Sequence, residues 1–543
     1  MPDALVHFLT LGALVSTISS GALYFNHVYN PESILPIVSF EQCFYTSISS
    51  LVMMLLSVLY WSDRLKLLRL NMPNVPSSVP YLGHAIRFTV QSPWDAMLQW
   101  HKQYGEIFAF PLMGRTMISL SSPDHLKIAL QSKIHAVKKD VEFTYQPFMV
   151  ILGKGIVTSE DKAWMKQRLK MSTALRINVL EIIPLITLKA VQRLMEKLDR
   201  AVEKGDSINL TESLRHLTLQ VISNSFLSIS FDESDSSFGK LYLPIVEECN
   251  QRIYHPYRAS CFFLPFWWRH WNRVSHLNQY VSSLIQNRWE DRNSSGSRQN
   301  DILDLVLDAY EKEHKLQSKV PTVDLSQMRD EFKTFMLAGH ETSAAMMTWA
   351  LYEMMAKQSL ADEVAKESGF VFNFDTDWAT SDELPSLESL SNLVFAESCL
   401  KESLRKYSVV PLVIRRVVNE LDLGQYRISP GSRLAINIQA VHHNPKYWPD
   451  PMTFDPHRFL NQKPAPYTFL PFLEGPRNCL GQHLSLLESK MVLALLTQRY
   501  QFRATKEINT ELGSKSSDPR HQYIVPVTPK EDLYVFVSKR KPA

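Results

Sequence analysis

The sequence predicts a protein built mainly of helices, with a membrane anchor at its N-terminus. Three stretches lead to this prediction. Residues 325–357 carry apolar side chains at helical spacing over a long run, and a second apolar run, 484–496, follows a loop bounded by glycines. Before Arg64 the chain has no Lys or Arg, and it contains two long apolar stretches there.

The loop Phe472–Gly481 presents one cysteine directly ahead of the second helix. Gly475 and Gly481 allow its backbone to turn sharply and to lie close to a flat object. Because Cys479 precedes a helix N-terminus and lies two residues from Arg477, we expect its sulfur to be biased toward the thiolate, a soft metal ligand. The alternative is that Cys479 packs as one more small buried residue.

This pattern, Phe-x-x-Gly-x-Arg-x-Cys-x-Gly, resembles the heme-binding loop of the cytochromes P450, in which a cysteine thiolate is the proximal ligand of the heme iron. The resemblance covers about residues 80–538. It implies the cytochrome P450 fold, a mainly α domain with a small β region. It also implies heme b (iron protoporphyrin IX) as the cofactor, with Cys479 on the iron and Phe472, Gly475, Arg477 and Gly481 around it.

The apolar stretches 5–25 and 43–61 each approach the ~20 residues that a bilayer-spanning helix needs. Basic residues from Arg64 to Arg69 follow, and the positive-inside rule places this flank in the cytosol. The first stretch has three interpretations: a second span, a signal peptide, or a helix along the membrane. Asp3 argues against the signal peptide. We therefore expect residues 1–70 to anchor the protein in the endoplasmic reticulum, with its catalytic domain facing the cytosol; a plastid envelope is the alternative.

Three prolines between Pro73 and Pro80 stiffen the chain after this anchor. They resemble the proline-rich hinge of microsomal P450s, so we expect a hinge at 71–80 and the heme-binding catalytic domain at 81–543. A net charge of +3 without a basic tract argues against nucleic acid as a partner. Five cysteines at irregular spacings argue against a disulfide framework or a zinc site.

Trp164 and Arg168 lie four residues apart in a predicted helix, so they share one face. They resemble the pair in P450s that hydrogen-bonds a heme propionate. The alternative is a half-buried surface pair. Just before them, Tyr145 and Phe148 look like part of a loop that lines the substrate chamber, with core packing as the alternative.

The segment Cys261–Trp268 is the densest apolar cluster outside the N-terminus, and Arg258 and Arg269 flank it. Aromatic side chains beside cations suit a membrane interface. In microsomal P450s the corresponding region dips into the bilayer beside the substrate entrance. A buried corner between helices is the alternative.

The long helix 325–357 has Asp324 as a candidate N-cap. A glycine inside a helix costs ~1 kcal/mol relative to alanine, so Gly339 indicates the close approach of something bulky. The segment Ala338–Ser343 resembles the distal-helix signature of P450s. That resemblance implies that Ala338 and Gly339 admit the porphyrin and oxygen, and that Glu341 and Thr342 deliver protons. A solvated Glu341 beside a core Thr342 is the alternative.

Glu402 and Arg405 lie three residues apart on another predicted helix and can form a charge-assisted hydrogen bond. By resemblance, Arg458 completes a Glu-Arg-Arg network that braces the heme loop. Arg415 would meet the second propionate, with Arg416 as the competing choice. Further residues of the expected substrate pocket are Phe335, Val410 and Leu412.

These resemblances imply a monooxygenase that hydroxylates a lipophilic substrate, such as a sterol, a fatty acid or a carotenoid, with O2. The chain has no dinucleotide fingerprint, so electrons must come from a separate reductase, by resemblance NADPH-dependent. One alternative is a P450-fold isomerase or dehydratase that needs no reductase; those branches typically lose the acid–alcohol pair. Another is a non-enzymatic heme carrier or sensor.

Overall fold

The computed structural model describes residues 40–76, 79–175, 178–255, 257–296, 298–299, 301–316, 324–373, 376–381, 383–512, 518–521 and 525–540. The predicted membrane stretch 5–25 lies outside these residues. The chain forms two compact units. The first contains the residues up to Ser122 with His135–Val137 and Arg415–Ile436. The second contains Pro123–Ile134, Lys138–Ile414 and the residues from Asn437 onward.

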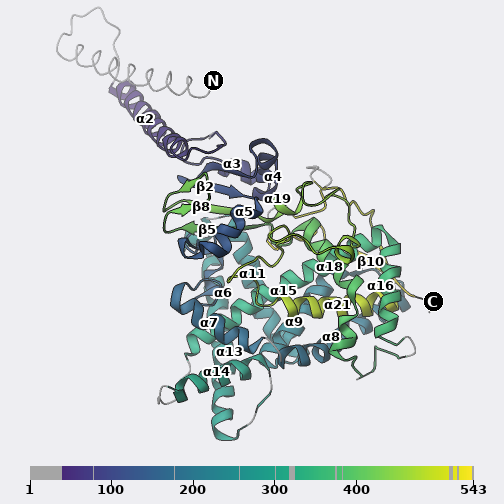
Figure 1. The fold of residues 1–543 in the computed structure, drawn as a ribbon. Coiled ribbons are helices and arrows are strands. Elements are labelled where there is room, and N and C mark those ends of the chain that lie inside the picture. Colours follow the sequence, from purple (N-terminus) through teal and green to yellow (C-terminus); the bar gives the residue numbers. More distant parts are fainter. Residues whose placement is uncertain are drawn as a thin grey trace, which may run out of the picture. The chain divides into compact units, whose positions relative to one another are not determined.

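A five-stranded sheet has the strand order β1-β2-β8-β5-β3 (Figure 1); β1, β2 and nearly all of β8 belong to the first unit, whereas β5 and β3 are divided between the units, with Leu412–Ile414 and Lys138–Lys139 in the second. Strands β1 and β2 are antiparallel and pair Ile107 with Leu120, whereas β2 and β8 are parallel. Strand β1 is buried along its whole length, and Trp100 packs against Phe108 and Phe110. The elements are α2 (Phe40–Leu68), α3 (Ala85–Val90), α4 (Pro93–Tyr104), β1 (Ile107–Leu112), β2 (Arg115–Leu120), β3 (Val137–Lys139), β5 (Leu412–Val417), β6 (Leu421–Asp422), β7 (Arg427–Ile428) and β8 (Arg433–Asn437).

Helix α2 contains the predicted stretch 43–61. Its apolar side chains Leu51, Leu55 and Val58 are exposed, whereas Ser50 and Ser57 are buried. In the part of the chain that the structure describes, no helix is both long enough and apolar enough to cross a membrane. The prediction of a membrane-crossing helix at 43–61 is therefore not confirmed; serine and threonine residues interrupt the apolar sequence of α2.

The segment expected to be a hinge is tied to the sheet of the first unit. The Val75 N–H donates to the Ala109 carbonyl at 2.8 Å, and the Ala109 N–H donates to the Pro73 carbonyl at 2.8 Å. Two backbone hydrogen bonds to a buried strand fix this segment in place. The described residues of 71–80 thus belong to the first unit together with residues 81–122.

The second unit is mainly helical, and α15 and α21 lie in its middle in Figure 1, near α8, α9, α16 and α18. A three-stranded sheet in the order β4-β10-β9 completes it. Its elements are α5 (Pro123–Lys127), η1 (Ile128–Ser132), η2 (Ile134–Ala136, at the boundary between the units), η3 (Gln146–Phe148), α6 (Met149–Leu152), α7 (Asp161–Ala174), α8 (Asn178–Lys204), β4 (Ile208–Asn209), α9 (Leu210–Leu227), α10 (Phe231–Glu233), η4 (Ser234–Phe238), α11 (Gly239–Tyr254), α12 (Tyr257–Ser260), α13 (Pro265–Ser294), α14 (Ile302–Leu316), α15 (Leu325–Ala356), α16 (Gln358–Val371), α17 (Leu387–Ser391), α18 (Val394–Tyr407), α19 (Ile438–His442), α20 (Arg458–Asn461), α21 (Gln482–Arg499), β9 (Tyr500–Ala504) and β10 (Tyr534–Lys539).

Helix α15 begins and ends within one residue of its predicted bounds. The Asp324 side chain caps it by accepting from the Gln327 N–H at 3.0 Å. Every side chain from Ser343 to Met354 is buried, as in a helix that is surrounded by protein. Between Phe335 and Thr342 the helix is more open, and Ala338 is exposed. This opening in an otherwise buried helix marks where a ligand can approach it.

Candidate functional site

The cysteine loop is held in a sharp turn by its own backbone. The Cys479 N–H donates to the Phe472 carbonyl at 2.8 Å. Gly475 has a φ of +82°, and a Cβ at this position would overlap the backbone of Leu130, so only glycine fits there. At Gly481 a Cβ would meet only the Cys479 Sγ, at 4.0 Å. The space beside the sulfur is therefore open.

The electrostatics of Cys479 combine opposing effects. The Cys479 side chain is exposed to solvent. Desolvation by the surrounding protein raises the pKa of the Cys479 thiol, and the N–H groups of Gly481 and Gln482 and the Arg168 guanidinium offset only part of this effect. The bias of Cys479 toward the thiolate stays a prediction for the heme-bound protein. A cation on the sulfur is needed to favour the thiolate.

Helix α7 presents Trp164 and Arg168 to this loop, as their spacing predicts. Arg168 donates from Nη1 to the Asn478 carbonyl at 2.6 Å and from Nη2 to the Asn478 Oδ1 at 2.5 Å. The Arg477 guanidinium lies 4.2 Å from the centroid of the Trp164 ring and pairs with Glu160. Both arginines therefore join α7 to the cysteine loop.

The open part of α15 converges on the same place. The Ser343 and Ser485 hydroxyls are 2.8 Å apart, which ties α15 to the first turns of α21, just after the cysteine loop. Beside this contact, the Thr342 hydroxyl donates to the Ala338 carbonyl at 2.6 Å. This is the usual bond of a mid-helix threonine. Ala338 and Thr342 thus lie in the part of α15 that is open next to α21.

The comparisons with known proteins agree with this geometry. A family model described as Cytochrome P450 matches residues 73–525. The chain belongs to the cytochrome P450 family. It is 28% identical to cytochrome P450 4c21 of Blattella germanica over 87% of this chain and 93% of that protein. It is 26% identical to protein LUTEIN DEFICIENT 5, chloroplastic, of Arabidopsis thaliana over 74% of this chain and 68% of that protein.

Among solved structures, the heme domain of a cytochrome P450DA mutant shares the fold of this P450. The TM-score is 0.73 at 22% sequence identity, and the match covers 87% of this chain and 98% of the other. Membership of the family makes this protein a cytochrome P450 monooxygenase, an oxidoreductase with a heme iron cofactor. The fold is mainly helical with small sheets, as predicted.

The residues at the site fit a heme group. Cys479 supplies a soft sulfur donor that faces accessible space, which suits heme iron. Gly481 leaves room beside the sulfur, and Ala338 is exposed on α15. Arginine side chains from α7 and from the loop itself lie next to this space, where carboxylates of a cofactor could be paired.

Gly339 has a different neighbour from the one expected. A Cβ at this position would lie 2.9 Å from Cδ1 of Ile222 on α9. The bulky group that approaches Gly339 is thus a side chain of a packed helix. The neighbouring turn is fixed in the same way, because the Thr218 hydroxyl of α9 donates to the His340 carbonyl at 2.9 Å. A contact between Gly339 and the cofactor stays a prediction.

Glu341 lies on α15 among side chains of α9 and α11. Burial raises the pKa of its carboxyl, and Arg215 of α9 lowers it in part. Its negative charge in turn adds to the burial that raises the pKa values of Tyr242 and Cys249 on α11. These surroundings favour the protonated form of Glu341, which is the form that can give up a proton.

The Glu-Arg-Arg contacts are present in this P450. Arg405 donates to both carboxylate oxygens of Glu402 at 2.8 Å, and Arg458 Nε donates to Glu402 at 3.1 Å. The carboxylate of Glu402 also accepts from the Asp455 N–H at 3.0 Å. His457, the residue before Arg458, contacts the carboxylates of Glu363 and Asp455, each at 3.3 Å.

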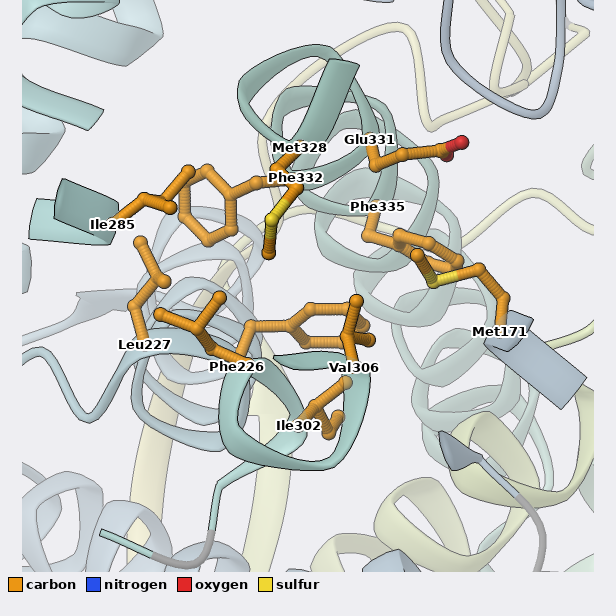
Figure 2. A pocket seen from close by; sticks show the side chains of 11 residues that line it. Met171, Phe226, Leu227, Ile285, Ile302, Val306, Met328, Glu331, Phe332 and Phe335 are labelled. Carbon is orange, nitrogen blue, oxygen red and sulfur yellow. The ribbon is translucent and has the colours of Figure 1, made fainter. Parts of the chain in front are cut away.

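The expected pocket residues do not form one group. The Phe335 ring lies 4.9 Å from the Phe226 ring in a tilted arrangement and lines a small cavity of about 30 Å³, shown in Figure 2. This cavity is large enough for one or two water molecules only. Tyr145, Phe148, Val410 and Leu412 are half-buried in the second unit. Arg415 is buried in the first unit, so its assignment to a propionate stays a prediction.

Sequence reasoning missed Glu160 and Asn478, the two acceptors that hold the arginines of the site. Asn478 precedes the cysteine, and Glu160 is the residue before α7. A carboxylate four residues before Trp164 has no local signature. Its role follows only from the packing of segments that are more than 300 residues apart.

Proposed function

We propose that this P450 is a heme-thiolate monooxygenase that hydroxylates a lipophilic substrate, a sterol, fatty acid or carotenoid-like molecule. It would use heme b, O2 and electrons from a separate NADPH-dependent reductase. The observation that supports this most is the convergence of two features. The accessible Cys479 sulfur, with open space beside it, lies in the loop just before α21, and the exposed turn around Ala338 lies on α15, which the Ser343–Ser485 contact joins to α21.

Cys479 would hold the iron, and the bound heme would supply the activation of dioxygen for C–H oxidation. Arg168, Arg477 and Trp164 would orient the porphyrin from α7 and the loop. For Arg477 this means exchanging its partner Glu160 for a propionate. Phe472, Gly475 and Gly481 shape the loop, and the two glycines would let its backbone lie close to the cofactor.

Glu341 and Thr342 would move protons at the distal side. Burial raises the pKa of the Glu341 carboxyl toward the neutral range, in which acid–base groups exchange protons most effectively. The Thr342 hydroxyl would leave the Ala338 carbonyl to bond a water or an oxygen-derived group in the open turn.

Membrane association would bring the protein to its substrate. Phe262 and Phe263 are 64% and 69% exposed, and Trp268 is 58% exposed, so this aromatic cluster is not a buried corner. The apolar face of α2 is a second exposed surface. Aromatic side chains favour a membrane interface. We place the protein on the endoplasmic reticulum with the catalytic domain in the cytosol.

The substrate classes rest on the apolar surfaces and on one relative. The name of LUTEIN DEFICIENT 5 refers to lutein, which supports the carotenoid-like class. For the reductase, Lys162 and Lys166 on the exposed side of α7 offer positive charge close to Arg168. Such a patch suits an acidic electron donor.

Replacement of the cysteine tests the assignment. Cys479→Ser should remove the thiolate signature from the spectrum of the reduced carbon monoxide complex, because a serine hydroxyl is a poor, hard ligand at neutral pH. Cys399→Ser is the matched control, since this buried thiol of α18 lies outside the loop and should leave the signature unchanged. A Cys479→Ser protein that keeps the signature would overturn the proposal, and conversion of lipid substrates without reductase would favour the isomerase.

A further inference from the structure

His442, the last residue of α19, links the Glu-Arg-Arg network to the chain that leads into the cysteine loop. It is fully buried. Its carbonyl accepts a hydrogen bond from Arg405 Nη1 at 3.0 Å. Its ring Nε2 lies 2.8 Å from the Leu470 nitrogen and accepts that backbone N–H. One residue thus contacts α18 with its backbone and the approach to the loop with its side chain.

The hydrogen bonds define a single tautomer of this ring. Because Nε2 accepts from Leu470, the proton lies on Nδ1. Nδ1 then donates to the Ser408 hydroxyl at 3.1 Å, and that hydroxyl donates to the Arg405 carbonyl at 3.3 Å. Every polar atom of the ring is used, and only the neutral imidazole satisfies both contacts.

The bond to Leu470 is followed by two more that end at the cysteine. The Leu470 carbonyl accepts from the Leu473 N–H at 3.1 Å, and the Phe472 carbonyl accepts from the Cys479 N–H at 2.8 Å. Thr468 and Phe469, the two residues before Leu470, also contact neighbouring side chains. The Trp448 indole donates to the Thr468 carbonyl at 3.0 Å, and the His442 ring lies 5.4 Å from the Phe469 ring.

We propose that His442 is a positioning residue for the Cys479 sulfur: its neutral ring anchors Leu470 and so transmits the rigidity of the Glu402–Arg405 pair to the cysteine loop. The proposal rests on Cys479 being the iron ligand, as proposed above. Arg405 itself donates to the carbonyls of His442, Pro451 and Thr453. The His442 side chain is the contact that continues to Leu470.

The surroundings of the ring keep it neutral. Burial lowers the pKa of His442 well below its usual value, and the nearby Arg405 and His443 lower it further, while the Leu404 backbone raises it slightly. A protonated ring would carry a proton on Nε2 and would lose the Leu470 N–H. The hydrogen bond from the Leu470 N–H to His442 Nε2 therefore persists at neutral pH and breaks when acid protonates the ring.

Three variants of the full-length holoenzyme test the proposal. His442→Leu removes the acceptor and leaves the Leu470 N–H buried without a partner. His442→Gln keeps an acceptor oxygen near the position of Nε2 but cannot be protonated. His443→Gln is the control, because the ring of this neighbouring buried histidine bonds the Lys406 carbonyl of α18. Amide hydrogen exchange of residues 466–481 and the reduced carbon monoxide spectrum against pH are measured for each.

We expect His442→Leu to speed exchange in residues 466–481 about tenfold or more, in line with the loss of one buried hydrogen bond. Its thiolate signature should also disappear at a higher pH than in the wild type. His442→Gln should exchange like the wild type at neutral pH and should keep the signature further into acid. His443→Gln should leave the exchange of this segment unchanged, even where it lowers overall stability.

Exchange in His442→Leu that matches the wild type would overturn the proposal. The same holds if His443→Gln speeds exchange as much, since a general loss of stability would then explain the effect. If His442→Leu yields no holoenzyme, the pH profile of His442→Gln decides, because an unchanged acid midpoint excludes the ring as the anchor. The exchange readout does not depend on which atom binds iron, so it separates this proposal from that for Cys479.

Discussion

The two sides of the candidate heme site are built differently. On the cysteine side, Glu402, Arg405 and His442 are fully buried, and their polar contacts run to other side chains of the network and to backbone atoms. On the distal side, the turn from Ala338 to Thr342 is partly open, and its threonine bonds only within its own helix. Buried and paired polar groups hold one geometry, whereas open groups can change partners. The cysteine side thus fixes the ligand, and the distal side can rearrange during the reaction.

The largest effect is expected from breaking the buried ion pair. Glu402→Gln leaves the Arg405 guanidinium buried without its carboxylate, which costs about 3–5 kcal/mol of folding free energy for pairs of this kind. Little heme should be retained on purification, as measured by the heme-to-protein ratio. Lys506→Ala breaks an exposed pair with Glu531 and should leave that ratio unchanged. Normal heme content in Glu402→Gln would show that the network is not the brace of the loop.

A pair of glycine variants sharpens the contrast. In Gly475→Ala the new methyl group would collide with the Leu130 backbone at a φ of +82°, so the loop must move and the thiolate signature should be lost. In Gly339→Ala the methyl group meets only the end of the Ile222 side chain, which can rotate, and the helix gains ~1 kcal/mol of propensity. Thermal unfolding should therefore change little for Gly339→Ala. If Gly339→Ala lost the thiolate signature and Gly475→Ala kept it, the cysteine loop would not be the more rigid side of the site.

How much of this could be read from the sequence depends on the range of the interactions. The bounds of α15, its Asp324 cap and the cysteine loop follow local patterns, and they were predicted closely. The partners of Arg168 and Arg477 were not predicted, because they depend on which distant segments pack together. The desolvation that raises the pKa of Cys479 could not be predicted either, because it comes from the packing of distant segments, whereas the N–H groups of Gly481 and Gln482 that lower it are local.

The distal side is tested by Thr342→Ala. Removal of the hydroxyl frees the Ala338 carbonyl and opens little space, so heme content and substrate binding should stay as in the wild type. Positioned acid–base groups contribute ~10²–10⁴ in rate, although water can replace part of this. Product formed per NADPH consumed should fall while NADPH consumption continues and peroxide accumulates. Thr348→Ala, which removes a similar bond two turns further along the buried part of α15, is the control for helix stability. If the wild type, Thr342→Ala and Thr348→Ala form equal amounts of product per NADPH consumed, Thr342 has no role in proton delivery.

The smallest effect on activity is expected from Glu331, which lies on α15 before the open turn. Burial raises the pKa of its carboxyl to about 7, although its Oε2 accepts the Ile156 N–H at 2.9 Å. In Figure 2 this carboxyl group points away from the apolar side chains of the small cavity.

Because of this raised pKa, the folded protein binds a proton on Glu331 that the unfolded chain releases near pH 4.5, and stability falls as pH rises from about 4.5 to 7. Glu331→Gln keeps an acceptor for Ile156 without a charge, so it should stabilise the protein by about 1–3 kcal/mol above pH 7 and flatten this slope. Unfolding by denaturant at pH 5 and pH 8 measures the slope, with the exposed Glu388→Gln as the control. An unchanged slope would show that Glu331 is ionised in the folded protein at neutral pH. The product formed per NADPH consumed should be the same in Glu331→Gln and the wild type, because this carboxyl lies three turns of α15 from Thr342.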